Sequence, residues 1–158
     1  MDITNIKEMN YEEVFSITIT VDKPILIGQD DIVGRRQLIP IISGKVSGNN
    51  FNGEVLPGGI DSQIVRPDGK CELSARYAIR LDDGAAIYIE NNGIRTVPDE
   101  YIEAVKSGEF VDPNAYYFRT IPTFETYSPK YKWMMNHIFV CCASRLPENV
   151  LLKFYKIS

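Results

Sequence analysis

Apolar and polar residues alternate with a period of two along most of the chain. The clearest run is residues 71–81, CELSARYAIRL, in which every second residue is apolar. Such alternation is typical of a β-strand with one buried face. Turns flank this run at residues 67–69 (Pro-Asp-Gly) and 82–84 (Asp-Asp-Gly), where glycine accepts the positive φ that tight hairpins require. Residues 53–90 therefore predict three consecutive antiparallel strands.

Further runs rich in β-branched or aromatic residues predict strands at 13–21, 38–46, 51–65, 85–91, 115–127, 136–144 and 150–157. Residues 56–61 (LPGGID) cannot pass through a flat sheet, so they predict a bend or barrel corner. Pro40 predicts a sheet edge or a bulge, because proline lacks the N–H of a ladder. We expect residues 28–37 to form a loop and residues 91–93 (Asn-Asn-Gly) to form a hairpin turn.

One short helix is predicted at residues 98–108. Pro98 or Asp99 opens it, an apolar stripe includes Ile102 and Val105, and Gly108 ends it. The pattern predicts one all-β domain over residues 1–158, an antiparallel barrel of about eight to ten strands, because closure removes exposed edges. A two-sheet sandwich is the alternative.

Charge and composition exclude several classes of function. The chain has 158 residues, a net charge of −4 and three cysteines, at 71, 141 and 142. An acidic chain without a concentrated basic face is not typical of nucleic-acid binding. The cysteines have no spacing that suits zinc or a redox pair, so they predict reduced, mostly buried thiols, no metal and no cofactor. The polar start of the chain and the lack of a long apolar run predict a cytoplasmic protein without membrane partners.

Charged residues in the middle of predicted strands are the candidates for chemistry. Asp61 and Glu125 are candidate catalytic acids or bases, because burial raises the pKa of a carboxyl. Arg76 and Arg119 are candidate ligand-binding residues, because a guanidinium matches a carboxylate with two hydrogen bonds. We expect these four side chains to share one interior region. A solvated outer face is the alternative for the charges, and a turn cap is the alternative for Asp61.

A ligand site is predicted in the barrel mouth. Gly58 and Gly59 remove side chains where a ligand can approach, Trp133 offers a flat apolar wall, and Asn136 offers a donor and an acceptor. Tyr88 is a further candidate ligand-binding residue. His137, the only histidine, is more typical of a structural donor than of a base.

Several segments together resemble the domain-of-unknown-function family 3237, also called uncharacterised protein family 0311. They cover nearly the full length and include GKVSG at 44–48, GEVLPGGID at 53–61, YFRT at 117–120, FET at 124–126 and YKWMMN at 131–136. The resemblance implies a small antiparallel barrel similar to the allene oxide cyclase type, usually oligomeric. It implies no established activity.

Two functions follow from these expectations. The first is a barrel that binds a small, largely apolar ligand with a carboxylate or polar end, with isomerase, cyclase or lyase chemistry that needs no cofactor. The second is a structural barrel with a filled lumen, which uses the aromatic strand at 115–127 to pack against another subunit of a homo-oligomer. An open cavity of several hundred Å³ favours the first.

Overall fold

The computed structural model describes residues 1–158, which form ten strands. The strands are β1 Tyr11–Val21, β2 Ile25–Asp30, β3 Gly34–Gly48, β4 Gly53–Val55, β5 Gly59–Val65, β6 Cys71–Leu81, β7 Ala86–Thr96, β8 Tyr117–Thr126, β9 Ile138–Arg145 and β10 Asn149–Ile157. One α-helix, α1 Ile102–Ser107, and three 3-10 helices, η1 Asp99–Tyr101, η2 Pro113–Ala115 and η3 Pro129–Asn136, lie between strands. The predicted all-β class is confirmed.

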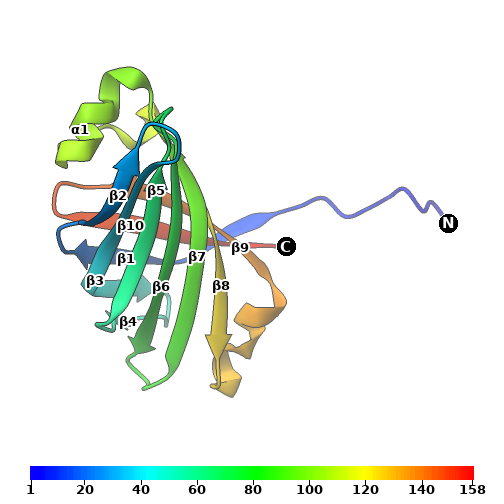
Figure 1. Ribbon diagram of the computed structural model, residues 1–158. Coiled ribbons are helices and arrows are strands. Elements are labelled where there is room, and N and C mark those ends of the chain that lie inside the picture. Colours follow the sequence, from blue (N-terminus) through cyan, green and yellow to red (C-terminus); the bar gives the residue numbers. More distant parts are fainter.

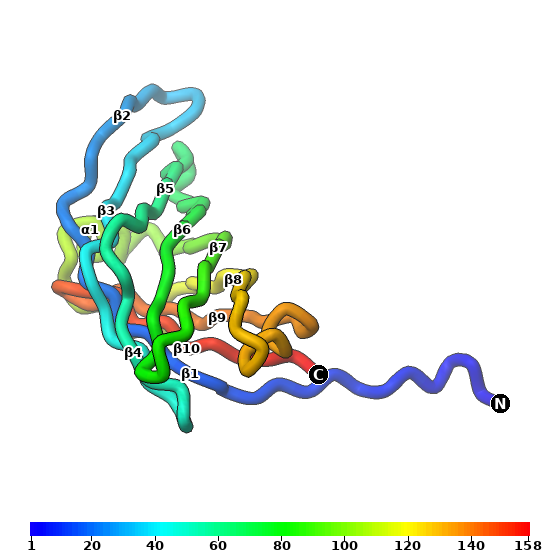
Figure 2. The backbone as a smooth tube through the Cα atoms, turned by 90° about the horizontal axis from the view of Figure 1, so that it is seen from below, coloured from blue at the N-terminus to red at the C-terminus, as the bar shows by residue number.

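The strands form one antiparallel sheet that closes on itself. Neighbours follow the order β1, β10, β9, β8, β7, β6, then β4 and β5 in succession, then β3. Because β3 also pairs with β1, the sheet forms an eight-stranded barrel with β4 and β5 sharing one position in its wall (Figure 1). Seen from below, the strands curve round a common interior (Figure 2). The barrel prediction is confirmed, and the sandwich alternative is excluded.

The hairpin of β2 and β3 extends one side of the wall beyond β1. The loop predicted at 28–37 is wrong, because β2 pairs with the first half of β3. The Asp30 carboxylate accepts hydrogen bonds from the backbone N–H groups of Ile32 and Val33, at 2.9 and 2.6 Å, and Gly34 has a φ of 106°. The polar residues therefore form a tight turn between two strands, as Asp and Gly commonly do.

Two irregularities bend the wall of the barrel. Pro40 pairs with Ile60 on one side, while on the other its carbonyl accepts the Asp22 N–H at 3.0 Å, next to a register shift between β1 and β3. This confirms the predicted bulge at Pro40. Between β4 and β5, Gly58 takes a φ of 102°, which confirms the predicted corner.

β7 runs without interruption through residues 91–93, so the predicted hairpin there is wrong. Gly93 pairs with Thr120 of β8, and a Cβ at Gly93 would lie 2.2 Å from the carbonyl oxygen of Arg119. The glycine serves a close approach of two strands rather than a turn. As a result, the inward alternation of β7 continues to Arg95.

The predicted short helix is confirmed and lies at one end of the barrel (Figure 1). Gly108 ends α1 in the left-handed conformation, and its N–H meets the carbonyls of Ala104 and Val105. Val105 is buried against the core. η3 lies at the other end of the barrel. None of these helices has the length and hydropathy that crossing a membrane requires.

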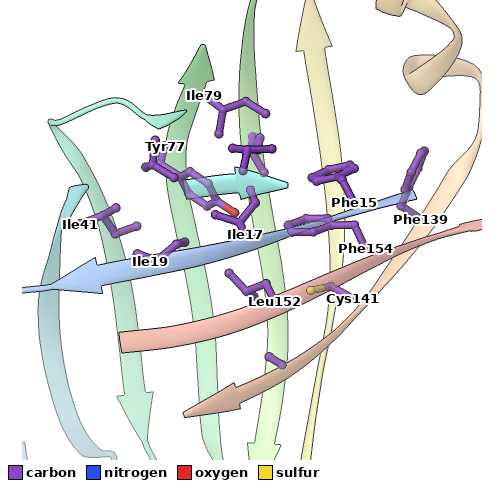
Figure 3. Close-up of a cluster of buried hydrophobic side chains, with 14 of the residues drawn as sticks. Phe15, Ile17, Ile19, Ile41, Tyr77, Ile79, Phe139, Cys141, Leu152 and Phe154 are labelled. Atoms are coloured by element: carbon purple, nitrogen blue, oxygen red, sulfur yellow. The ribbon is translucent and has the colours of Figure 1, made fainter. Parts of the chain in front are cut away.

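Aromatic side chains fill the barrel near η3. Phe15 stacks on Phe51 and on Phe154, with ring centroids 4.4 Å apart in each pair. Phe15, Phe139 and Phe154 point into the interior from three different strands (Figure 3). Other rings in this cluster belong to Phe124 and Tyr131. This end of the lumen is therefore packed with the chain's own side chains.

We expect Phe154→Ala to lower the free energy of unfolding by about 3–5 kcal/mol, because it removes a fully buried, doubly stacked ring. Phe154 is 0% exposed. Ile138→Ala on the outer face, where Ile138 is 69% exposed, is the control and should change stability by less than about 0.5 kcal/mol. Urea denaturation measures both. Equal losses would contradict the aromatic cluster as the main core.

Candidate functional site

Two neighbouring cavities occupy the α1 end of the lumen. The outer one, here called the mouth, has a volume of about 430 Å³ and lies between the β2–β3 hairpin, β7, α1 and the end of β9. The inner cavity has about 60 Å³ and is lined mostly by apolar side chains, among them Ile39, Leu73 and Leu152. Arg95 and Arg145 line both cavities. The two cavities therefore adjoin at these two arginines.

Three arginines line the mouth, and none has a carboxylate partner. Arg35 comes from β3, Arg95 from β7 and Arg145 from the end of β9. All five ion pairs of the structure involve other residues. The Nε atoms of Arg35 and Arg145 are closed off from solvent without an acceptor. Burial, with the charge of Arg95, lowers the pKa of Arg145.

Asp61 lies in the inner cavity at the end of a chain of side-chain amides. Gln37 Nε2 donates to Gln63 Oε1 at 2.9 Å, and Gln63 Nε2 donates to Asp61 Oδ2 at 2.7 Å. The second oxygen, Oδ1, is buried and makes no hydrogen bond of ordinary geometry, although the Ser74 backbone N–H lies near enough to lower the pKa of the carboxyl. Burial raises the pKa of Asp61 above its ordinary value of 3.8, although the Gln63 hydrogen bond and the Arg95 charge oppose the rise.

Three more buried polar atoms in the inner cavity lack partners. They are the Tyr77 hydroxyl, Asn91 Oδ1 and Thr120 Oγ1, on residues that are no more than 4% exposed. Tyr77 points into the interior from β6 (Figure 3), and burial raises the pKa of its hydroxyl. Native proteins leave few such atoms unpaired. Their convergence on one cavity is typical of a ligand site.

Gly59 makes room for this arrangement. A Cβ there would lie 2.5 Å from the Cβ of Tyr77. Only glycine lets the start of β5 approach β6 at that point. The bend at 58–59 thus brings Asp61 to the same cavity as Tyr77.

The buried cysteines are not nucleophiles at neutral pH. Burial raises the pKa of Cys71, beside the mouth, to about 11 and that of Cys141 to about 12. The thiolate, which is the reactive form, is therefore scarce. All three cysteines are free thiols, and no group of three or more His, Cys, Asp or Glu side chains is arranged to hold a metal ion.

The structure places most of the predicted charged residues on the outside of the barrel. Arg76, Tyr88, Arg119 and Glu125 all point outward, opposite the inward residues of their strands. The expectation that Arg76, Arg119 and Glu125 share an interior with Asp61 is wrong. Of these four charged residues, only Asp61 lies on the lumen side of its strand.

Outward contacts account for these side chains. Arg76 lies 4.0 Å from Glu90, and the Tyr88 hydroxyl donates to Glu90 at 3.3 Å. The Arg119 guanidinium lies over the ring of Tyr117, 5.5 Å from its centroid. Glu125 accepts the Tyr127 hydroxyl at 2.8 Å. These are ordinary surface interactions, which contribute little to stability.

The predicted mouth near Trp133 is at the wrong end of the barrel. Trp133 packs against Phe139 in the aromatic cluster, and Asn136 is exposed on η3. Gly58 has open space around it and borders neither cavity. The aromatic filling of that end leaves the lumen open only toward α1.

The candidate site residues that the sequence analysis missed are Arg35, Arg95 and Arg145. Arg95 follows Ile87, Ile89, Asn91 and Gly93 at a spacing of two, a signal that the hairpin assigned at 91–93 concealed. Arg145 continues the inward series of Cys141 and Ala143 in the same way. Arg35 stood in the segment assigned as a loop. Strict period-two alternation along each strand would have placed Arg95 and Arg145 on the inward face.

We expect Asp61→Asn to raise the free energy of unfolding at pH 7, because it removes a buried charge. The folded-state pKa of Asp61 is raised, so its contribution to stability is complete below pH 3.8 and is lost as the pH rises through the folded value. The gain from the substitution should therefore disappear toward pH 4. Urea denaturation at pH 4 and 7 measures it, with exposed Glu125→Gln as the control. A variant less stable than wild type at pH 7 would contradict the raised pKa.

Comparison with known proteins places the chain in a family. A family profile described as "Protein of unknown function (DUF3237)" matches residues 9–157. A "UPF0311 protein" of Clostridium acetobutylicum is 99% identical over 158 residues, which is 100% of both chains.

Two solved structures share the barrel. The crystal structure of a conserved protein of unknown function from Rhodopseudomonas palustris is 41% identical, with a TM-score of 0.90 over 97% of this chain and 99% of that one. A "beta-barrel like protein" from Acinetobacter baumannii is 32% identical, with a TM-score of 0.85 over 98% and 99% of the two chains. The chain therefore belongs to the DUF3237 family of proteins of unknown function.

Proposed function

We propose that the barrel binds a small organic acid through the mouth at the α1 end. The anionic end contacts Arg35, Arg95 and Arg145, and the uncharged end enters the inner cavity. The two volumes suit this division, because about 430 Å³ falls in the range of ligand pockets, whereas about 60 Å³ accepts only a small group.

The observation that carries the proposal is the set of three mouth arginines without carboxylate partners. A partly buried cation without a counter-charge is costly, and native proteins normally pair it. Here the protein's net charge is −4, yet the mouth gathers Arg35, Arg95, Arg145 and Lys106 against one carboxylate, Glu103. A carboxylate ligand would supply the missing partner with charge-assisted hydrogen bonds.

The unpaired polar atoms of the inner cavity support the same function. Asp61, Tyr77 and Thr120 present oxygens that no protein group satisfies. A ligand hydroxyl at the inner end would donate to Asp61 and accept from Tyr77 or Thr120, whereas a ligand carbonyl would accept only from the two hydroxyl groups. The carbon atoms of the ligand would contact Ile39, Leu73 and neighbouring apolar side chains. The ligand class is therefore a small acid that carries a second, uncharged polar group.

The structural-barrel alternative has support only at the η3 end, where the lumen is filled. The outer face of β8 does expose apolar side chains, namely Tyr117 and Ile121 at 49% and 61%. These side chains suit contact with another subunit, and the homo-oligomer stays a prediction. A scaffold role alone gives no reason for unpaired arginines around a cavity at the opposite end.

We expect small carboxylates, such as benzoate, hexanoate and 4-oxopentanoate, to raise the melting temperature saturably. Arg95→Met and Arg145→Met should each weaken binding by about tenfold or more, because one charge-assisted hydrogen bond contributes ~1.5 to 3 kcal/mol. Thermal-shift titration and isothermal calorimetry measure the effect. Arg76→Met, an outer-face arginine whose side chain is 63% exposed, is the matched control and should leave affinity within about twofold.

Two results would count against an anion site in the mouth. One is a panel in which benzamide and hexanamide bind as well as their acids. The other is an equal loss of affinity in the Arg76 and Arg95 variants.

A further inference from the structure

Resting on the proposed binding of an organic acid, we propose that the inner cavity is a proton-transfer site. Asp61 acts as the general base toward a carbon next to a carbonyl, and the Tyr77 hydroxyl binds the oxygen of that carbonyl. The substrate class is an oxo acid: a carboxylate for the mouth and a ketone or aldehyde carbonyl for the inner cavity.

The geometry around Asp61 leaves one carboxylate oxygen for the substrate. Gln63, itself held by Gln37, fixes Oδ2 at 2.7 Å. Oδ1 makes no hydrogen bond of ordinary geometry and faces no bulk water. A general base must be held in place and still have a free lone pair within reach of the proton. Asp61 meets both conditions.

Tyr77 is the hydrogen-bond donor best placed for a developing negative charge. Its hydroxyl is buried and makes no hydrogen bond of ordinary geometry within the protein, and Tyr77 lines the same cavity as Asp61. Preorganised donors in a site without water stabilise an oxyanion strongly. Thr120, with an equally free hydroxyl, can assist.

The cationic side chains lie at the mouth, and their position there orients the substrate. Arg95 and Arg145 border both cavities, whereas Arg35 and Lys106 border only the mouth. A carboxylate is thus held at the entrance, and only an uncharged group of a few heavy atoms enters the 60 Å³ beyond it. The carbonyl end of an oxo acid meets this requirement, whereas a diacid does not.

The step balances without a further reactant. The Asp61 carboxylate takes a proton from the carbon next to the carbonyl. The C–H electron pair forms the enolate C–C double bond, and the carbonyl π electrons move to oxygen, where Tyr77 donates its hydrogen bond. Protonated Asp61 then returns the proton to the same carbon or to a conjugated one. When the proton on Asp61 is replaced from solvent before it is returned, the first outcome exchanges substrate hydrogen with solvent. The second outcome moves a double bond, and the carboxylate is regenerated in both.

Proton exchange in deuterium oxide tests the proposal. The probes are 4-oxopentanoate and 5-oxohexanoate, and ¹H NMR follows loss of the signals beside the ketone. Wild type should exchange these protons faster than an equal concentration of the Asp61→Asn variant by about a hundredfold or more, the usual contribution of a general base. Tyr77→Phe, which keeps the ring and removes only the hydroxyl, should be slower by about tenfold or more.

Matched controls and binding separate this proposal from the previous one. Glu125→Gln and Tyr88→Phe make the same chemical changes on the outer face and should exchange at the wild-type rate. If the probes bind in an Arg95-dependent manner but wild type exchanges no faster than Asp61→Asn, proton transfer is overturned and binding stands. If neither probe raises the melting temperature, both proposals are overturned for oxo acids.

Discussion

The pairing of β1 with β3 is the constraint on which the rest of this structure depends. It joins the first strand to the wall that the other strands build, so the sheet has an inside and an outside over its whole circumference. Once the sheet is closed, the alternation along each strand determines whether a side chain points into the lumen or toward the outside. One residue of displacement separates Asp61, which lines the lumen, from Ser62, whose hydroxyl receives an outward hydrogen bond from Arg36.

Closure alone does not make a binding site, because a barrel of eight strands is narrow enough for its own side chains to fill. The two ends of this lumen differ in how completely side chains fill them. Near η3, large rings such as Phe15 and Phe154 meet at 4.4 Å and leave no space. Toward α1, apolar side chains such as Ile39 and Leu73 share the lumen with the polar side chains of Asp61 and Asn91, and they line a cavity instead of filling it.

The sequence was sufficient for the barrel and insufficient for the site, and the reasons are local. Alternation, the corner at Gly58 and the helix before Gly108 are signals that a few neighbouring residues determine. The face of a charged residue depends on register over a whole strand. An assigned turn at 91–93 therefore hid Arg95, and Arg119 was placed inside although Phe118 and Thr120 take the inward positions. Arginines do line the cavity at the α1 end, but identifying the particular residues required the closed sheet.

Opposing effects act on the pKa of Asp61, which lies in the same lumen as the mouth arginines. The Gln63 hydrogen bond and the charge of Arg95 both favour the ionised carboxylate, yet burial outweighs them and raises its pKa. A carboxyl with that balance is a stronger base than an exposed one when ionised, and it remains anchored through Oδ2 in either state. Of the three mouth arginines, Arg95 lowers the pKa of Asp61, and none of the three forms an ion pair with the carboxylate. One lumen therefore holds a cluster of arginines and a buried carboxylate that are not paired with each other.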